Sequence, residues 1–202
     1  MKTICLYFEI HQIIHLKRYR FFEIGTDHYY YDDYANEQGI NEVVERSYVP
    51  ALNTLIEMAR ANGGAFKVAL SISGVALEQL EIHAPIVIEL LHQLNDTGCC
   101  EFLCEPYSHG LSSLANEDCF REEVLRQRDK MKQMFGKEPK VLGIHAGLEC
   151  GLFSEKYPGL DMVSFGPTLR GVHSPDERLL IPTVAMVWDH IKAILKNIPA
   201  KA

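Results

Sequence analysis

The sequence has no apolar run long enough to span a membrane and no surplus of basic residues. No segment reaches the roughly 18 consecutive apolar residues that a membrane-spanning helix needs. The formal charge of −7 argues against nucleic-acid binding, which would need clustered Lys and Arg side chains. Glu9 and His11 interrupt the apolar N-terminal stretch, so no signal-peptide core forms there. We therefore expect a cytoplasmic protein with no nucleic-acid and no membrane partner.

The sequence also lacks a second ligand pair at zinc-finger spacing. It contains six cysteines without an export signal, which favours reduced, buried thiols over a disulfide framework. Cys100 and Cys104 could suggest a metal site, but the residues around them alternate as in a strand. Structural thiols are the expected role of the cysteines.

Strand-like apolar runs alternate with helix-like periodic runs along the chain. This pattern is typical of an α/β fold with a mainly parallel sheet of βα units. The expected strands are 3–10, 66–73, 99–107, 139–144 and 162–166. The expected helices are 42–61, 75–95, 116–135, 148–156 and 183–197.

Segment 12–39 is the one long stretch that we expect to be irregular. A loop of this length inside a compact domain usually has a function. Its run of tyrosines and acidic residues at 27–34 suits either a platform for sugar rings or a packed aromatic loop. The sequence leaves both alternatives open.

Polar residues follow the expected first and third strands. Glu9, His11 and Gln12 close the first strand. The third strand carries Glu101, and polar residues continue beyond it at Glu105, Tyr107 and His109. Carboxylates, imidazoles and tyrosines at one edge of a sheet suit a sugar, although a strand-end histidine with only a structural role is the alternative.

Four segments carry a resemblance to a known family: MKTICLYFEIHQ, RYRFFEIGTDHYYYDDYANE, FKVALSISGVALEQL and TGCCEFLCEPYSHGL. From residue 1 to about 140 the chain resembles the N-terminal part of family 57 glycoside hydrolases, the α-amylase and 4-α-glucanotransferase group. The resemblance implies a truncated (β/α)7 barrel. It also implies action on α-glucans with retention, by a Glu nucleophile and an Asp acid/base, and no cofactor.

The resemblance assigns roles to individual residues. The family's His-Gln-Pro motif falls on His11 and Gln12, with Ile13 in place of the proline. Its Gly-x-x-Glu motif ends at Glu101. His11 and Glu101 would then line the sugar subsite next to the scissile bond.

A Tyr-x-His element of the family falls on Tyr107 and His109, although Pro106 replaces the small residue expected before the tyrosine. Together with Gln12, these residues complete the expected binding site for an α-glucan or maltooligosaccharide.

The nucleophile of the family is missing. Ala146 stands roughly where its glutamate belongs, and retaining hydrolysis needs that carboxylate. The acid/base Asp would lie beyond the resemblance. No complete catalytic set is therefore expected. The alternatives are a glycosidase that recruits another carboxylate, such as Glu149, and a non-catalytic interaction or carbohydrate-binding remnant.

Segments KVLGIHAGLECGLFSEKYPGLDMVSFGPTLRGVHSPDERLLI and VWDHIKAILKNIP resemble the C-terminal end of aminoacyl-histidine dipeptidases, which are zinc enzymes. The resemblance implies that His173 is the last ligand of a two-zinc site and that His145 and Glu149 line the substrate pocket. One histidine cannot hold zinc, because such sites need at least three protein ligands. Zinc is implied only by this resemblance, and we expect neither zinc binding nor peptidase activity.

We expect residues 1–140 to be a partial glycoside hydrolase barrel and residues 141–202 to be a dipeptidase-like βαβα segment, joined near Lys140 as a chimera. A truncated barrel would expose strand edges, which predicts a homo-oligomer. His11, Glu101 and His109 as zinc ligands are not favoured, since their spacing matches no metal motif.

Overall fold

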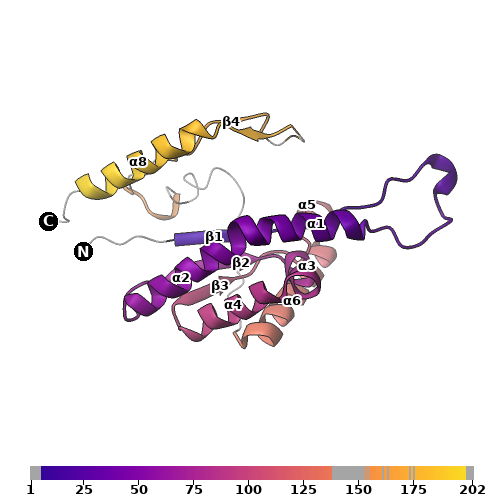
Figure 1. The fold of residues 1–202 in the computed structure, drawn as a ribbon, viewed down its shortest axis with the longest axis horizontal. Helices are drawn as coiled ribbons and strands as arrows, with labels where there is room; N and C mark the ends of the chain where they lie inside the picture. The colour runs from indigo at the N-terminus through magenta and orange to yellow at the C-terminus, as the bar shows by residue number, and fades with distance from the viewer. Residues whose placement is uncertain are drawn as a thin grey trace. The chain divides into compact units, whose positions relative to one another are not determined.

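The computed structural model describes residues 6–137, 153, 155–160, 162, 164–172, 174 and 176–198. The chain divides into two compact units, Ile4–Leu142 and Gly143–Ala202 together with the first three residues. Each unit is described by itself. Figure 1 shows their elements and the labels used below.

A parallel sheet of three strands forms the centre of the first unit. Its strands are β1 (Leu6–Ile10), β2 (Val68–Ile72) and β3 (Cys100–Leu103), in the order β1-β2-β3. Both pairings are parallel, with Leu6 opposite Val68 and Val68 opposite Cys100. The α/β fold with a parallel sheet is thus confirmed.

Helices connect the strands. Before β2 lie α1 (Asp33–Val43), the π-helical turn η2 (Val44–Tyr48) and α2 (Val49–Ala61). Before β3 lie α3 (Gly74–His83) and α4 (Pro85–Asp96), and after it α5 (Ser112–Ala115) and α6 (Glu117–Phe135). The single helix expected at 75–95 is wrong, because the chain breaks at Ala84 before the proline that opens α4.

Alternate side chains of the sheet build the hydrophobic core. Val68, Leu70 and Ile72 of β2 and Phe102 of β3 are buried in one cluster with apolar residues of α2, α3 and α4. The ring of Phe135 at the end of α6 stacks on Phe102 with centroids 4.3 Å apart. This burial is the main source of the unit's stability.

The other face of the sheet is polar. In-register neighbours of parallel strands share a face, so Tyr7, Ala69 and Glu101 form one row and Glu9, Ser71 and Leu103 the next. Tyr7, Glu9 and Glu101 are exposed. The sheet therefore has an apolar face on the helices and a polar face with partly accessible carboxylates.

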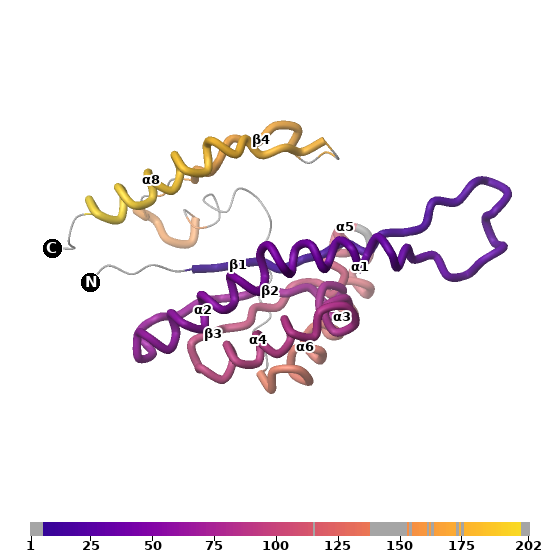
Figure 2. The backbone as a smooth tube through the Cα atoms, viewed as in Figure 1, coloured from indigo at the N-terminus to yellow at the C-terminus, as the bar shows by residue number. Residues whose placement is uncertain are grey.

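Residues 12–32 form a projecting arm between β1 and α1, visible in both backbone views (Figures 1 and 2). Its two limbs pair through Lys17 N donating to Tyr30 O at 2.8 Å and an antiparallel bridge between Leu16 and Tyr31. The irregular segment was expected to continue to residue 39, and this is wrong, because a helix begins at Asp33. Asp32 accepts a hydrogen bond from Ala35 N and so starts α1 at Asp33.

The second unit contains a short antiparallel ribbon and a long helix. Strands β4 (Leu169–Arg170) and β5 (Arg178–Leu179) pair, and α8 (Pro182–Asn197) confirms the last expected helix. The strand expected at 162–166 is wrong for its described residues, which form no ladder with another strand. The strand expected at 139–144 lies outside the described residues.

No helix in the described part of the chain is long and apolar enough to cross a membrane. Cys99 and Cys100 are buried thiols, as expected, whereas Cys119 is exposed and contradicts the expectation. Cys119 lies on the solvent-facing side of α6. The sequence pattern in the first turn of this helix does not show which side faces solvent. Burial raises the pKa of Cys100 to about 12, so its thiol stays protonated at neutral pH.

Candidate functional site

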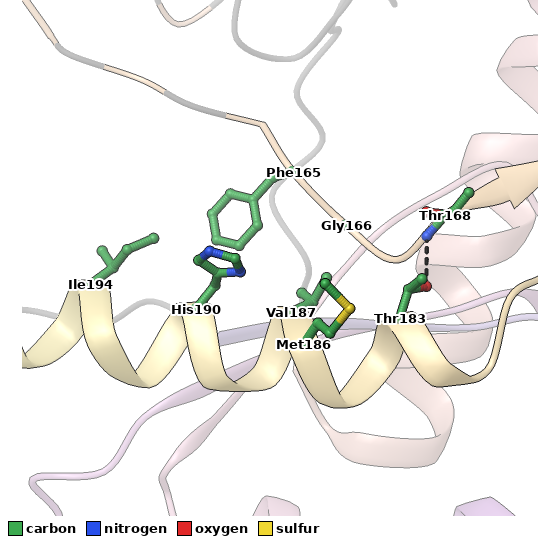
Figure 3. Close-up of a pocket in the computed structure, with 8 residues that line it drawn as sticks. All are labelled: Phe165, Gly166, Thr168, Thr183, Met186, Val187, His190 and Ile194. Atoms are coloured by element: carbon green, nitrogen blue, oxygen red, sulfur yellow. Dashed lines mark hydrogen bonds between the residues drawn. The ribbon is translucent and has the colours of Figure 1, made fainter.

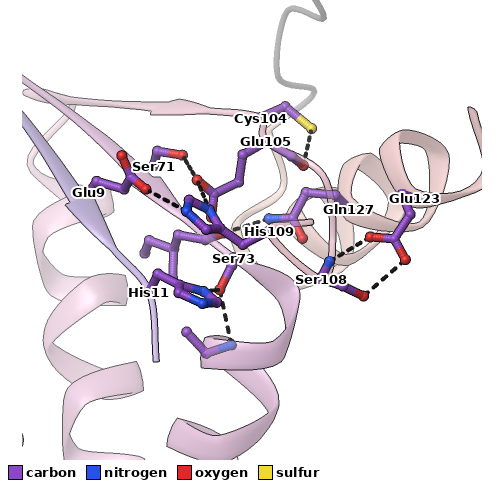
Figure 4. A network of polar contacts seen from close by, with 12 residues as sticks. Glu9, His11, Ser71, Ser73, Cys104, Glu105, Ser108, His109, Glu123 and Gln127 are labelled. Atoms are coloured by element: carbon purple, nitrogen blue, oxygen red, sulfur yellow. Dashed lines mark hydrogen bonds and ion pairs between the residues drawn. The ribbon is translucent and has the colours of Figure 1, made fainter. Parts of the chain in front are cut away.

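Six polar residues meet at the carboxyl ends of the three parallel strands. We call them the strand-end cluster: Glu9, His11, Ser71, Ser73, Glu105 and His109 (Figure 4). They come from the end of β1, the end of β2 and the loop that follows β3. This edge is where open and barrel-shaped parallel sheets bind ligands.

His109 lies between two carboxylates. Its Nε2 is 3.2 Å from Glu9 Oε1, and its Nδ1 is 3.4 Å from Glu105 Oε2. Its backbone is in the left-handed region at φ 53°, and its N–H donates to Pro106 O at 2.9 Å. Because a residue other than glycine rarely adopts this conformation, the turn 106–109 stores strain to aim the imidazole at the carboxylates.

His11 is held as a neutral imidazole. Its Nδ1 lies 2.8 Å from Ser73 Oγ, and that hydroxyl also accepts from Ala76 N as the N-cap of α3. Which of the two groups donates depends on the tautomer of His11, and the bond leaves Nε2 as the ring nitrogen without a Ser73 contact. Burial, and next the neighbouring His109, lower the pKa of His11.

Glu105 is the most enclosed acid of the strand-end cluster. Its side chain keeps 11% of its accessible surface, and Ser71 Oγ donates to its Oε2 at 2.8 Å. Its Oε1 is buried and has no hydrogen-bond partner among the described residues. Burial is the main cause that raises the pKa of Glu105, and the charge of Glu9 adds to it.

Two of the residues expected in the site lie apart from the strand-end cluster. Glu101 lies inside β3 opposite Ala69, one row before the row of Glu9 and Ser71. The side chain of Gln12 lies toward Gly39 of α1, and its backbone carbonyl accepts from Gln79 Nε2 at 2.9 Å.

Tyr107 also lies apart, in a packed structural position. Its Oη donates to Glu78 Oε1 at 2.5 Å, and the guanidinium of Arg126 lies 3.8 Å from its ring centroid. Burial, and next the bond to Glu78, raise the pKa of Tyr107 to about 12. The side chain is 3% exposed, so it ties the loop to α3 and α6 and offers little surface to a ligand.

The sequence analysis named Glu9 and Glu105 as strand-end acids but left them out of the expected site, and both lie in the strand-end cluster. It missed Ser71 and Ser73 altogether. Their spacing of two residues at the end of an apolar strand was the available signal, because alternate residues of a strand share a face.

His145, Glu149 and His173 lie outside the described residues, so their roles stay predictions. The described part of the second unit has a cavity of about 440 Å³ beside α8 (Figure 3). Its lining is mostly apolar, with Phe165, Met186 and Ile194 around the single imidazole of His190. One imidazole gives no basis for a zinc centre.

The chain matches Glycosyl hydrolase family 57 over residues 5–144. It is 34% identical to a putative alpha-amylase of Methanocaldococcus jannaschii over 113 residues, which make up 55% of this chain and 24% of that protein. It is 51% identical to the cytosol non-specific dipeptidase of Escherichia coli K12 over 74 residues, which make up 37% of this chain and 15% of that protein.

Among solved structures, the 4-alpha-glucanotransferase of Thermococcus litoralis is similar with a TM-score of 0.45 and 21% identity, covering 52% of this chain and 16% of that one. The chain thus spans less than a quarter of each of these relatives, at 24%, 15% and 16% of their lengths. Both resemblances predicted from the sequence, to family 57 and to a dipeptidase, are confirmed.

Proposed function

Because this chain belongs to glycosyl hydrolase family 57, we propose that its first unit is a partial β/α barrel of that family that binds α-glucans and does not hydrolyse them. The observation that carries the proposal is the strand-end cluster on the polar face of the sheet. It offers carboxylate acceptors and an imidazole N–H within reach of one another, and sugar hydroxyls need such paired acceptors and donors.

The proposed ligand contacts follow from the cluster's hydrogen bonds. His11 has its Nδ1 occupied by Ser73, so its Nε2 is the ring nitrogen available to a sugar hydroxyl. Glu9 and Glu101 are exposed acceptors on the same face. Gln12 and Tyr107 would hold the neighbouring loops in place without contacting the sugar.

The proposed loss of catalysis rests on a missing carboxylate. Ala146 stands where the family resemblance requires the nucleophile, and a retaining glycosidase forms its glycosyl intermediate on that group. Glu9 and Glu105 lie 3.2 and 3.4 Å from the ring nitrogens of His109, and neither stands at the position of the family's nucleophile.

We further propose that the chain is a fusion near Lys140, in the cytoplasm, whose dipeptidase-like end lacks the zinc ligands that peptidase activity needs. The two similarities, to family 57 and to a dipeptidase, support this proposal. Strands β1 and β3 are the edges of the described sheet. Pairing at such edges supports a homo-oligomer.

Calorimetry of the full chain with maltooligosaccharides tests the function. We expect heat of binding without release of reducing sugar. His11→Gln should weaken binding by about tenfold, the loss of one hydrogen bond to the sugar. His83→Gln, at the end of α3, is the matched control and should bind as the parent does.

Absence of binding at millimolar sugar would refute the glucan site, and equal binding by both variants would move it away from His11. Release of reducing sugar would refute the loss of catalysis. Cleavage of β-alanyl-histidine after zinc addition would refute the absence of peptidase activity.

A further inference from the structure

Glu9, Glu105 and His109 bring three possible metal-ligand atoms together. One carboxylate oxygen from each glutamate and one ring nitrogen of His109 lie within 4.8 Å of one another. Glu9 comes from β1, whereas Glu105 and His109 come from the loop after β3. Because parallel pairing fixes these two segments on either side of β2, the convergence is built into the sheet.

The spacing suits a small divalent ion. Zinc bonds to histidine nitrogen and carboxylate oxygen are about 2.0–2.2 Å long, so the ligands of a tetrahedral ion lie about 3.4 Å apart. Glu9 Oε1 and His109 Nε2 are 3.2 Å apart. The oxygen that Glu105 offers lies within 4.8 Å of the other two ligand atoms, so its side chain must shift to bind the same ion.

A second observation points to a missing partner at the same place. Glu105 keeps only 11% of its side-chain surface, and its buried Oε1 has no hydrogen-bond partner among the described residues. A buried carboxylate oxygen without a partner is costly, and a bound cation removes that cost.

We propose that Glu9, Glu105 and His109 bind one divalent transition-metal ion, with Zn²⁺ the best match, and leave a coordination position open. Three protein ligands with an open position is the arrangement of catalytic zinc sites. An imidazole among the ligands favours Zn²⁺ over Mg²⁺, which prefers oxygen alone, and Zn²⁺ binds more tightly than Mn²⁺.

The surroundings would orient these ligands. Ser71 Oγ donates to Glu105, and the ring of His11 stacks on His109 with centroids 4.2 Å apart. Hydrogen bonds of this kind commonly fix the ligands of metal sites. The proposal is independent of glucan binding, because metal affinity is measured without sugar.

Calorimetric titration of the chelator-treated full chain with ZnCl₂ tests the site. We expect one binding event that weakens more than about 100-fold in Glu105→Gln, since loss of a direct ligand exceeds the effect of an outer-shell change. Glu101→Gln, on the same face of the sheet but outside the group, is the matched control and should keep the parent's affinity. Equal affinities in both variants, or no binding to the parent chain, would overturn the proposal.

A second measurement needs no substitution. Substoichiometric Mn²⁺ added to the ¹⁵N-labelled full chain should broaden the amide resonances around Glu9, Glu105 and His109 before any others. Broadening that begins elsewhere would leave His109 as an ion-pair partner of the two carboxylates and would overturn the metal site.

Discussion

Gly74 and the ring of Tyr107 lie in such close contact that a methyl group on Gly74 would overlap the ring. Gly74 is the first residue of α3, directly after the Ser73 cap. Tyr107 lies in the loop that also carries His109. Val75 N donates to Tyr107 O at 3.2 Å, which fixes the same contact through the backbone. The loop after β3 is therefore positioned by its contact with the start of α3.

Gly74→Ala should destabilise the first unit by about 1–3 kcal/mol, because the added methyl group forces the buried ring or the helix to move. Urea denaturation of the full chain measures the change. Gly110→Ala is the matched control, since nothing lies within 4 Å of a Cβ at that position. A Gly74→Ala chain as stable as the parent would contradict the close contact.

Tyr107→Phe should cost about 1 kcal/mol of stability, because it removes the hydrogen bond to Glu78. Affinity for maltooligosaccharides should stay unchanged, since the side chain is buried. Tyr34→Phe, at a side chain that is 77% exposed, should change neither quantity. A loss of sugar affinity without a loss of stability would return Tyr107 to the binding site.

Glu105→Gln should make the chain more stable near pH 7 and alter it little below about pH 4.5. The pKa of Glu105 is raised in the folded chain, so its favourable contribution is present below the unfolded value of 4.5 and is lost as the pH rises through the folded value. Denaturation at pH 4 and pH 7, in the presence of a chelator, measures the difference. A glutamine variant that is less stable at pH 7 would show that the carboxylate is favoured by its partners.

Sugar affinity should hold as the pH falls to 6.5 and decline below it, because a second ring proton on His11 removes the ring's one acceptor nitrogen and the hydrogen bond that it accepts. The pKa of His11 is lowered, so the neutral form persists below the ordinary value of 6.5. Calorimetry across this range measures the step, and His11→Gln should lack it. A decline that begins above pH 6.5 would mean that the imidazole is easier to protonate than its burial implies.

Much of the fold was predictable because strands and helices have distinct periods. The strands around Phe8, Leu70 and Phe102 were expected at their observed places, although β2 and β3 are shorter at both ends than expected. The start of α1 was missed because its first turn contains Asp33, Tyr34 and Asn36, which show no apolar face.

The sequence predicted polar residues at the ends of the strands, but only some of the residues it named lie in the strand-end cluster. His11 and His109 were named, and their ring stacking needed the left-handed turn at His109, which sequence alone does not show. Tyr107 was expected at the ligand because it follows the third strand and matches the family's Tyr-x-His element. The chain leaves β3 at Leu103, and the loop beyond it turns the Tyr107 ring into a buried position.

The strand-end cluster and the helices that support it lie between Leu6 and Phe135. Gln127 of α6 donates to Ile72 O at 2.6 Å, so α6 is tied to the strand that ends at the cluster. During translation, the N-terminal part of a chain folds first, as a unit. The first unit, Ile4–Leu142, can thus fold while the second unit is still being synthesised. A replacement of the downstream sequence would then change the second unit of the chain and leave the folding of the first unit unchanged.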